Sequence, residues 1–262
     1  MLDRAILKLV AAMTIAVSAS TAALGQNERE MLAPSGTLRI GAYPGSPLSM
    51  VREVKTGEIH GLSVDLGKEL AKQLDVPFEL VQFQRIADVL DAMKAGGLDF
   101  TVSNATPARA QDVAFSQSLL ALELGYLVPA ASPITTISDI NKTGVRVGVT
   151  QGSTSERTLP KLLPSATVVP AQNLKVAIEM LGRRELDAFA TNKPILFEIS
   201  DQMPGSKVLD GQWGIEQVAV AIPKGRENAL EYVRHFVGQA KSSGFLAQAV
   251  ERAGLRGTAK AE

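Results

Sequence analysis

Asn104-Ala105-Thr106-Pro107-Ala108-Arg109 is the stretch from which the fold and its binding site are inferred. It follows an apolar run, residues 98–102, that has the pattern of a buried strand. Thr106 and Pro107 are typical of a helix start, with a hydroxyl at the cap and a proline at the first helical position. Arg109 falls in that expected first turn, against the positive end of the helix dipole, which favours an anion bound between them. The stretch fits an ordinary capped helix with a surface arginine as well.

A second turn of the same kind follows the strand-like residues 145–149. This turn reads Thr150-Gln151-Gly152-Ser153-Thr154, and a helix is expected to begin at its two hydroxyl residues. The glycine allows a close approach of the backbone. Since ligands in open α/β sheets bind at the carboxyl ends of strands, two such turns can face each other across a cleft. For either turn alone, a plain strand-to-helix loop is the simpler interpretation.

Strand-like and helix-like patterns alternate along the chain, which predicts an α/β fold. An apolar segment at 119–129, ending in proline, is interpreted as a first crossing between two lobes, and 217–222 as the return strand. Two crossings would leave the first lobe discontinuous and form a hinge. The other expected strands are 38–42, 78–83, 98–103, 145–149, 167–169 and 186–191.

Five motifs stand in a fixed order along the chain: Gly36 to Gly41, Gly61 to Leu66, Thr106-x-x-Arg109 followed by Phe115-Ser116, Val147 to Thr154, and Leu186 to Thr191. Their order and spacing resemble those of the family 3 extracellular solute-binding proteins, the receptors of polar amino-acid ABC transporters. The resemblance covers nearly all of the chain beyond its N-terminal segment.

This resemblance implies a two-lobed periplasmic-binding-protein fold of type II, with an open sheet flanked by helices in each lobe and the ligand cleft between them. It implies a receptor, not an enzyme, that binds a small organic acid or amino-acid-like ligand and delivers it to an inner-membrane ABC permease. The expected division of the chain is a signal peptide at 1–25, a first segment of lobe 1 at 34–127, lobe 2 with the hinge crossings at 128–217, and a closing segment of lobe 1 at 218–262.

The same resemblance assigns ligand-binding roles to particular residues. Arg109 is expected to hold the carboxylate of the ligand, with Asn104 and Thr106 contributing polar groups beside it. Ser153 and Thr154 would close on the same carboxylate from the second lobe. A guanidinium that holds a carboxylate through two parallel hydrogen bonds makes a strong and directional contact.

Asn192 stands where the family usually has the aspartate that binds the α-ammonium group. An asparagine cannot neutralise a buried ammonium, and burying an unpaired charge is costly. We therefore expect a small organic acid, or an amino-acid derivative with a masked or missing α-amino group, unless Glu123, Glu198 or another acid substitutes. Asn192 also fits the cap of the helix that begins at Lys193-Pro194, and the two roles are compatible.

The aromatic wall that the family tends to place in the first lobe is reduced in this chain. Tyr43 either flanks the ligand or packs against its own loop. Arg85 precedes an expected helix and is either a solvated charge or a group that reaches the cleft. Trp213 precedes the return crossing and is interpreted as hinge packing.

The N-terminal residues have the pattern of a secretory signal. Arg4 and Lys8 form a basic region, residues 9–19 are mostly apolar, and Ala23-Leu24-Gly25 is an acceptable cleavage site. The alternative is an uncleaved membrane anchor, for which the apolar stretch is short. The chain has no cysteine, which excludes a lipoprotein anchor. Export without a lipid anchor predicts the periplasm of a Gram-negative bacterium.

Composition argues against several other functions. Lys plus Arg and Asp plus Glu number 27 each, with no basic stripe, so nucleic acid is not an expected partner. His60 and His235 are the only histidines, and no Ser/His/Asp arrangement or metal-ligand cluster is seen. We therefore expect no catalytic residue, no metal and no cofactor. We also expect the protein to be a monomer.

Two functions from other classes of protein remain as alternatives. An enzyme of the cyclohexadienyl dehydratase type shares the fold but needs a positioned acid such as Glu123 or Glu198. A periplasmic accessory or sensor protein would use the fold mainly to bind a protein partner.

Overall fold

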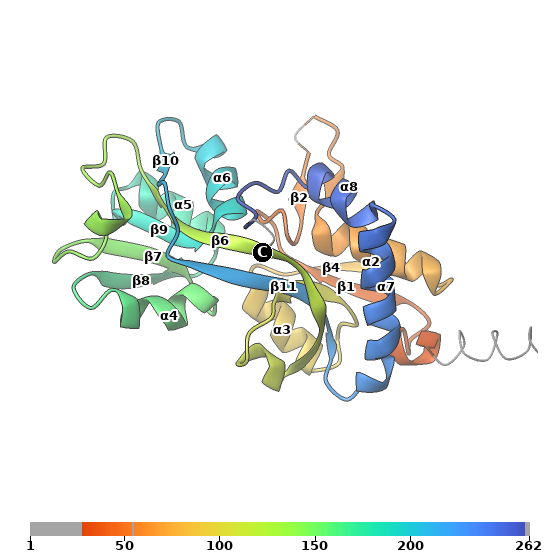
Figure 1. Ribbon diagram of the computed structural model, residues 1–262. Helices are drawn as coiled ribbons and strands as arrows, with labels where there is room; N and C mark the ends of the chain where they lie inside the picture. Colours follow the sequence, from red (N-terminus) through yellow and green to blue (C-terminus); the bar gives the residue numbers. More distant parts are fainter. Residues whose placement is uncertain (1–27, 54, 260–262) are drawn as a thin grey trace, which may run out of the picture.

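The computed structural model describes residues 28–53 and 55–259. The chain forms two α/β lobes joined by long strands that run between them (Figure 1). The predicted signal peptide at 1–25 lies outside the described residues. No described helix combines the length and the apolar character that a membrane crossing requires.

The first lobe is built on two parallel strands with helices packed against them. Strand β1 pairs with β4, and an isolated bridge between Ile40 and Phe100 adds the segment that leads into β5. Its core gathers apolar residues of α2, α7 and the strands, among them Leu66, Leu70 and Phe236. The elements are β1 (Leu38–Ala42), β2 (Val51–Arg52), β3 (Ile59–His60), α2 (Leu62–Gln73), β4 (Phe78–Gln82), α3 (Ile86–Lys94), β5 (Thr101–Asn104), η3 (Glu227–Ala229), α7 (Leu230–Ser242) and α8 (Phe245–Arg252).

The second lobe repeats this strand–helix order. Strand β7 lies between β8 and β9 and is parallel to both, as β1 is parallel to β4. Its helices enclose two further apolar clusters, with Val147 and Leu159 in one and Phe189 and Leu196 in the other. The elements are η2 (Ile137–Asp139), β7 (Arg146–Thr150), α4 (Thr154–Leu162), β8 (Thr167–Ala171), α5 (Leu174–Gly182), β9 (Ala188–Asn192), α6 (Lys193–Gln202) and β10 (Lys207–Val208).

Two long antiparallel strands, β6 (Val113–Val128) and β11 (Gly214–Pro223), belong to both lobes. At one end β11 pairs with β5 of the first lobe, and at the other β6 pairs with β9 and β10 of the second. The strand order of the shared sheet is β5-β11-β6-β9-β7-β8. The two expected crossings are therefore present as one ribbon. The predicted lobe boundaries fall near the end of β6 and within β11, and they stay predictions.

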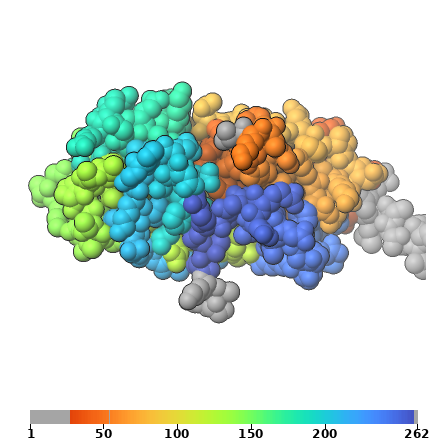
Figure 2. Space-filling model, turned by 90° about the horizontal axis from the view of Figure 1, so that it is seen from above, coloured from red at the N-terminus to blue at the C-terminus, as the bar shows by residue number. Residues whose placement is uncertain are grey.

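The C-terminal segment, residues 255–259, forms a third connection between the lobes. It leaves α8, and Thr258 forms a bridge with Leu122 in the middle of β6. Arg256 makes an ion pair of 2.5 Å with Asp201 on α6 of the second lobe. Figure 2 shows this dark-blue segment between the cyan residues of the second lobe and the blue helices of the first. The connection between the lobes therefore consists of β6, β11 and this C-terminal segment.

An arginine–aspartate pair of the same geometry stands in each lobe. The Asp99 carboxylate accepts from the backbone N–H of Arg39 at 2.9 Å and from two of its guanidinium nitrogens at 2.8 Å. The Asp187 carboxylate accepts from the same three groups of Arg146, at 2.8, 3.0 and 3.0 Å. In the first lobe the pair joins β1 to the segment that precedes β5. In the second lobe the matching pair joins β7 to the segment that precedes β9, so the two lobes are built in the same way at this point.

Asp99 is the more deeply buried of the two carboxylates. Its side chain is fully buried and also accepts from Arg226 at 2.8 Å, whereas the Asp187 side chain is 34% exposed. Burial favours a raised pKa for Asp99, but the hydrogen bonds from Arg39 and Arg226 outweigh it and hold the pKa below its ordinary value.

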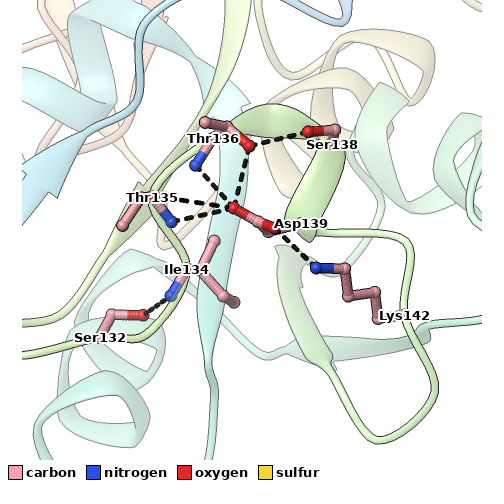
Figure 3. Close-up of polar contacts among 7 residues, drawn as sticks. All are labelled: Ser132, Ile134, Thr135, Thr136, Ser138, Asp139 and Lys142. Carbon is pink, nitrogen blue, oxygen red and sulfur yellow. Dashed lines mark hydrogen bonds and ion pairs between the residues drawn. The ribbon is translucent and has the colours of Figure 1, made fainter.

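The loop between β6 and β7 is ordered by one carboxylate, as Figure 3 shows. Asp139 accepts from the backbone N–H groups of Thr135 and Thr136 and from the Thr136 hydroxyl, which completes a capping box around η2. Lys142 donates to its other oxygen at 2.7 Å. Lys142 and these hydrogen bonds lower the pKa of Asp139. The entry into the second lobe is thus fixed locally.

The helix expected at Thr106 is wrong. Strand β5 ends at Asn104, and only a three-residue 3₁₀ turn, η1 (Arg109–Gln111), follows before β6 begins at Val113. The Ala110 N–H donates to the Thr106 carbonyl at 2.9 Å, which closes a single turn. Because β6 must pair with β11 from Val113 onward, too few residues remain for an α-helix. The argument that Arg109 opposes a helix dipole therefore fails.

We predict that the two aspartates contribute unequally to stability. Asp99→Ala is expected to lower the free energy of unfolding by about 3–5 kcal/mol, because it leaves two part-buried arginines without their partner. Asp187→Ala, at a more exposed pair, is expected to cost about 1 kcal/mol or less. Urea unfolding followed by circular dichroism at pH 7 measures both, and equal losses would contradict the assignment.

The contribution of Asp99 also depends on pH. Because its pKa is lowered in the folded protein, its stabilisation is present above the unfolded pKa, about 3.9, and is lost as the pH falls through the folded pKa. The difference in unfolding free energy between wild type and Asp99→Ala should therefore shrink below about pH 4. A difference of the same size at pH 7 and at pH 3 would show that the ion pair is not its source.

Candidate functional site

A cleft lies between the lobes, beside the carboxyl ends of β5, β7 and β9. Its free space, counted out to the open mouth, is about 560 Å³. Both lobes and the return strand β11 contribute polar and apolar side chains to its walls. The lining residues used below are Tyr43, Gln84, Arg85, Ser103, Asn104, Arg109, Ser153, Thr154, Asn192 and Glu216.

Arg109 is the buried cation of this cleft. Its side chain is nearly inaccessible, Nη1 donates to the Ser103 hydroxyl at 2.9 Å, and Nε has no hydrogen-bond partner among the described residues. Burial lowers the pKa of the guanidinium, and the neighbouring Glu216 carboxylate opposes that shift. Only one hydroxyl is seen to hold the guanidinium, so donors remain for a bound carboxylate.

The turn after β7 forms the opposite wall. Ser153 caps α4 by accepting from the Glu156 N–H at 3.2 Å, and the Glu156 carboxylate accepts from the Gly152 N–H at 2.6 Å. Gly152 has φ +76°, and a Cβ there would lie 2.5 Å from the Cβ of Ala87 on α3. Only glycine tolerates both the positive φ and the short distance to Ala87, and this allows the turn to approach the first lobe closely.

The two lobes touch each other across the cleft in this structure. Besides the contact at Gly152, the Arg85 guanidinium donates to the Gln151 side chain at 2.6 Å. Arg85 also pairs with Asp88 in the first turn of α3, at 2.9 Å. Of the two interpretations of Arg85, the structure supports the one in which it reaches the cleft.

Glu216 is a cleft residue that sequence reasoning missed. It lies on β11, its side chain is 7% exposed, and the Thr154 hydroxyl donates to it. Burial raises the pKa of Glu216, while Thr154 and the Arg109 guanidinium oppose the shift. One signal was available. Glu216 shares its strand face with the buried Val218 and Val220, and a carboxylate at an inward position of an apolar strand is unusual.

Most of the predicted site residues come together in the cleft. Those that line it are Tyr43, Asn104, Arg109, Ser153, Thr154 and Asn192. Thr106 does not line it; its hydroxyl accepts from the Arg109 N–H at 3.3 Å and so shapes the turn. Asn192 caps α6 as expected, because its side chain accepts from the Ile195 N–H at 3.3 Å. That these residues bind a ligand stays a prediction.

The acids proposed to replace the aspartate at position 192 lie elsewhere. Glu123 is paired with Lys193 at 2.5 Å, and Glu198 lies 3.9 Å from Arg256. Neither lines the cleft. Trp213 does not line it either; its indole N–H donates to the Gly125 carbonyl on β6 at 3.0 Å, and its ring packs against the second-lobe cluster that contains Tyr126.

Within residues 28–53 and 55–259, no group of histidine and acidic side chains is placed to hold a metal ion. His60 and His235 are not among the residues that line the cleft.

Comparison with known proteins agrees with this architecture. Residues 38–254 match the model of the bacterial extracellular solute-binding proteins, family 3. The glutamine-binding protein of Geobacillus stearothermophilus is 26% identical over 208 residues, 78% of this chain and 79% of the relative. The ABC transporter glutamine-binding protein of Bacillus subtilis (strain 168) is 23% identical over 251 residues, 92% of each chain.

A solved structure shares the fold at similar identity. The crystal structure of an ancestral amino acid-binding protein, described as a precursor of cyclohexadienyl dehydratase, superposes with a TM-score of 0.75 at 27% identity. The superposition covers 87% of this chain and 99% of that one. With a family model that matches most of its length and a cleft between two lobes of the same topology, the chain belongs to the bacterial extracellular solute-binding proteins, family 3.

Proposed function

We propose that this protein is the periplasmic receptor of an ABC importer, which captures a small amino-acid-like solute in the cleft and delivers it to a membrane permease. The observation that carries the proposal is Arg109, a buried guanidinium with unused donors in a cleft between two lobes. The proposal includes export by the predicted signal peptide at 1–25 and action as a monomer.

The relatives support this class of ligand and partner. Two of them are named as glutamine-binding proteins, one of an ABC transporter, and others as binding proteins for lysine, arginine and ornithine or for histidine. A carboxylate is the group that all amino acids share, and Arg109 is the cleft residue suited to it.

The proposed capture mechanism is closure about the hinge. The walls of the cleft come from both lobes, and contacts such as Arg85 with Gln151 join the lobes only when these walls meet. A ligand that touches both walls adds contacts to the closed form alone, so it shifts the population towards closure.

The enzyme alternative has one observation in its favour. Glu216 is a buried acid in the cleft with a raised pKa, which is the kind of group that acid-catalysed elimination of water requires. Incubation with a prephenate-like acid, followed by mass spectrometry of the small molecules, separates the two functions. Recovery of the acid unchanged supports the receptor, and conversion with loss of water and carbon dioxide supports the enzyme.

The first functional prediction concerns Arg109. Arg109→Ala should weaken binding of the best amino acid in a thermal-shift screen by about 2–5 kcal/mol, the range for removing one partner of a buried charge pair. Isothermal titration calorimetry measures the loss. Arg109→Lys keeps the charge but not the planar fork, so its affinity should fall between those of wild type and Arg109→Ala.

The matched control for this experiment is Arg234→Ala, on the exposed face of α7, which should bind as wild type does. A loss of less than tenfold in Arg109→Ala, with the protein still folded, would remove Arg109 from the binding site.

The second functional prediction concerns hinge closure. Small-angle X-ray scattering should give a smaller radius of gyration with saturating ligand than without it, because ligand contacts favour the closed form. Arg109→Ala at the same ligand concentration should keep the larger radius. An unchanged radius in the wild-type protein would mean that binding occurs without closure, which contradicts the proposed capture mechanism.

A further inference from the structure

The cleft is lined by few charged side chains. Of the residues that line it, three carry full charges: Arg85, Arg109 and Glu216. Arg85 is already paired with Asp88. The remaining two are both buried, and no direct ion pair joins them although the structure describes both side chains. The cleft therefore offers a ligand one buried cation, Arg109, and one buried anion, Glu216, which are not paired with each other.

The charge balance discriminates between classes of ligand. A monoanionic organic acid would leave one uncompensated negative charge in a closed cleft that already holds the Glu216 carboxylate. A zwitterion adds no net charge, and each of its charged groups finds a partner of opposite sign. Since an uncompensated buried charge is costly, the balance favours the zwitterion.

The strand register places Glu216 close to Asn192, the position at which the family usually has an aspartate. Leu124 of β6 is the direct partner of Asn192 on one side and of Gly214 on the other. Glu216 follows Gly214 by two residues, so it lies on the same face of the three strands as Asn192. Both side chains line the cleft. An acid on β11 therefore faces the same space as the asparagine at the end of β9.

Burial raises the pKa of Glu216, but its polar and charged neighbours oppose that shift and favour the ionised carboxylate. The Thr154 hydroxyl donates to it, and Thr154 is the first residue of α4, where the helix dipole is positive. Arg109 adds a second favourable charge at longer range. These donors occupy part of the carboxylate and leave lone pairs free, because an ionised carboxylate accepts about four hydrogen bonds.

We propose that Glu216, on the return hinge strand, binds the cationic group of the ligand, and that the ligand is therefore a zwitterion with its carboxylate on Arg109. This inference rests on the proposed receptor function and names the substrate class of that site. It replaces the expectation, drawn from Asn192 alone, that the ligand lacks a free amino group. Glu216 is the specificity-determining residue in this scheme, and Asn192 serves mainly as the cap of α6.

The test compares one amino acid with its deaminated counterpart. L-Glutamine is the first probe, because its side chain is neutral and Glu216 is the only carboxylate among the described residues that line the cleft. Its partner is the α-hydroxy acid with the same side chain, a monoanion at pH 7. L-Cysteine and L-histidine with their hydroxy acids complete the panel. Calorimetry gives the affinity ratio of each pair.

Wild type should prefer the amino acid. Glu216→Gln should lower the ratio of the two affinities by roughly 30-fold or more, the effect expected from removing one partner of a buried charge pair. The same variant should bind the hydroxy acid more tightly than wild type does, because the competing negative charge is gone. Adding Asn192→Asp to Glu216→Gln should restore part of the preference, since it returns an acid to the same face.

The opposite movement of the two affinities separates recognition from a structural role. If the Thr154–Glu216 contact served only to hold the lobes together, Glu216→Gln would weaken both ligands alike and leave the ratio unchanged, which would overturn the inference. Glu123→Gln is the matched control, a hinge-strand glutamate outside the cleft whose ratio should equal that of wild type. A failure of every amino acid to bind wild type would overturn the proposed function, and the inference with it.

Discussion

The arrangement of both lobes depends on a carboxylate that is held by the first strand of each. In each lobe an aspartate accepts from the backbone and the guanidinium of an arginine on that strand, Arg39 in one and Arg146 in the other. Asp99 is fully buried and is tolerated only with such complete pairing, whereas Asp187 is 34% exposed but makes the same contacts, so the relative position of the joined strands is constrained in both lobes. The parallel strands of each unit then end at one edge, and the two edges face each other.

The binding cleft is a consequence of that edge-to-edge placement. The strand ends and the segments that leave them carry the polar groups: Asn104 at the end of β5 and Arg109 after it, Ser153 and Thr154 after β7, and Asn192 at the end of β9. Ser153 and Asn192 also cap α4 and α6, while the two arginine–aspartate pairs hold the strands themselves in place.

The features that could be predicted from the sequence are those that depend on residues close together in the chain. Strand patterns, the cap of α4 at Ser153 and the cap of α6 at Asn192 depend on residues a few positions apart, and the structure has all of them. The helix expected at Thr106 is absent because β6 must begin at Val113 to pair with β11, a constraint set by residues far along the chain. Glu216 was missed for the same reason. Its position in the cleft follows from the pairing of β11 with β6, which no local motif encodes.

The place of Glu216 on a hinge strand has a mechanical consequence for the proposed receptor. In the closed arrangement the carboxylate is in contact with Thr154 of the second lobe and lies near Arg109 of the first. Arg109 follows β5, the strand with which β11 pairs, so opening the lobes would separate Glu216 from Thr154 but not from Arg109. On closure the Thr154 hydroxyl and the N-terminus of α4 come to the Glu216 carboxylate and stabilise its ionised form. A ligand whose cationic group pairs with this carboxylate would then bind more tightly in the closed form. Selectivity for the zwitterion and the drive to close would thus come from the same residue.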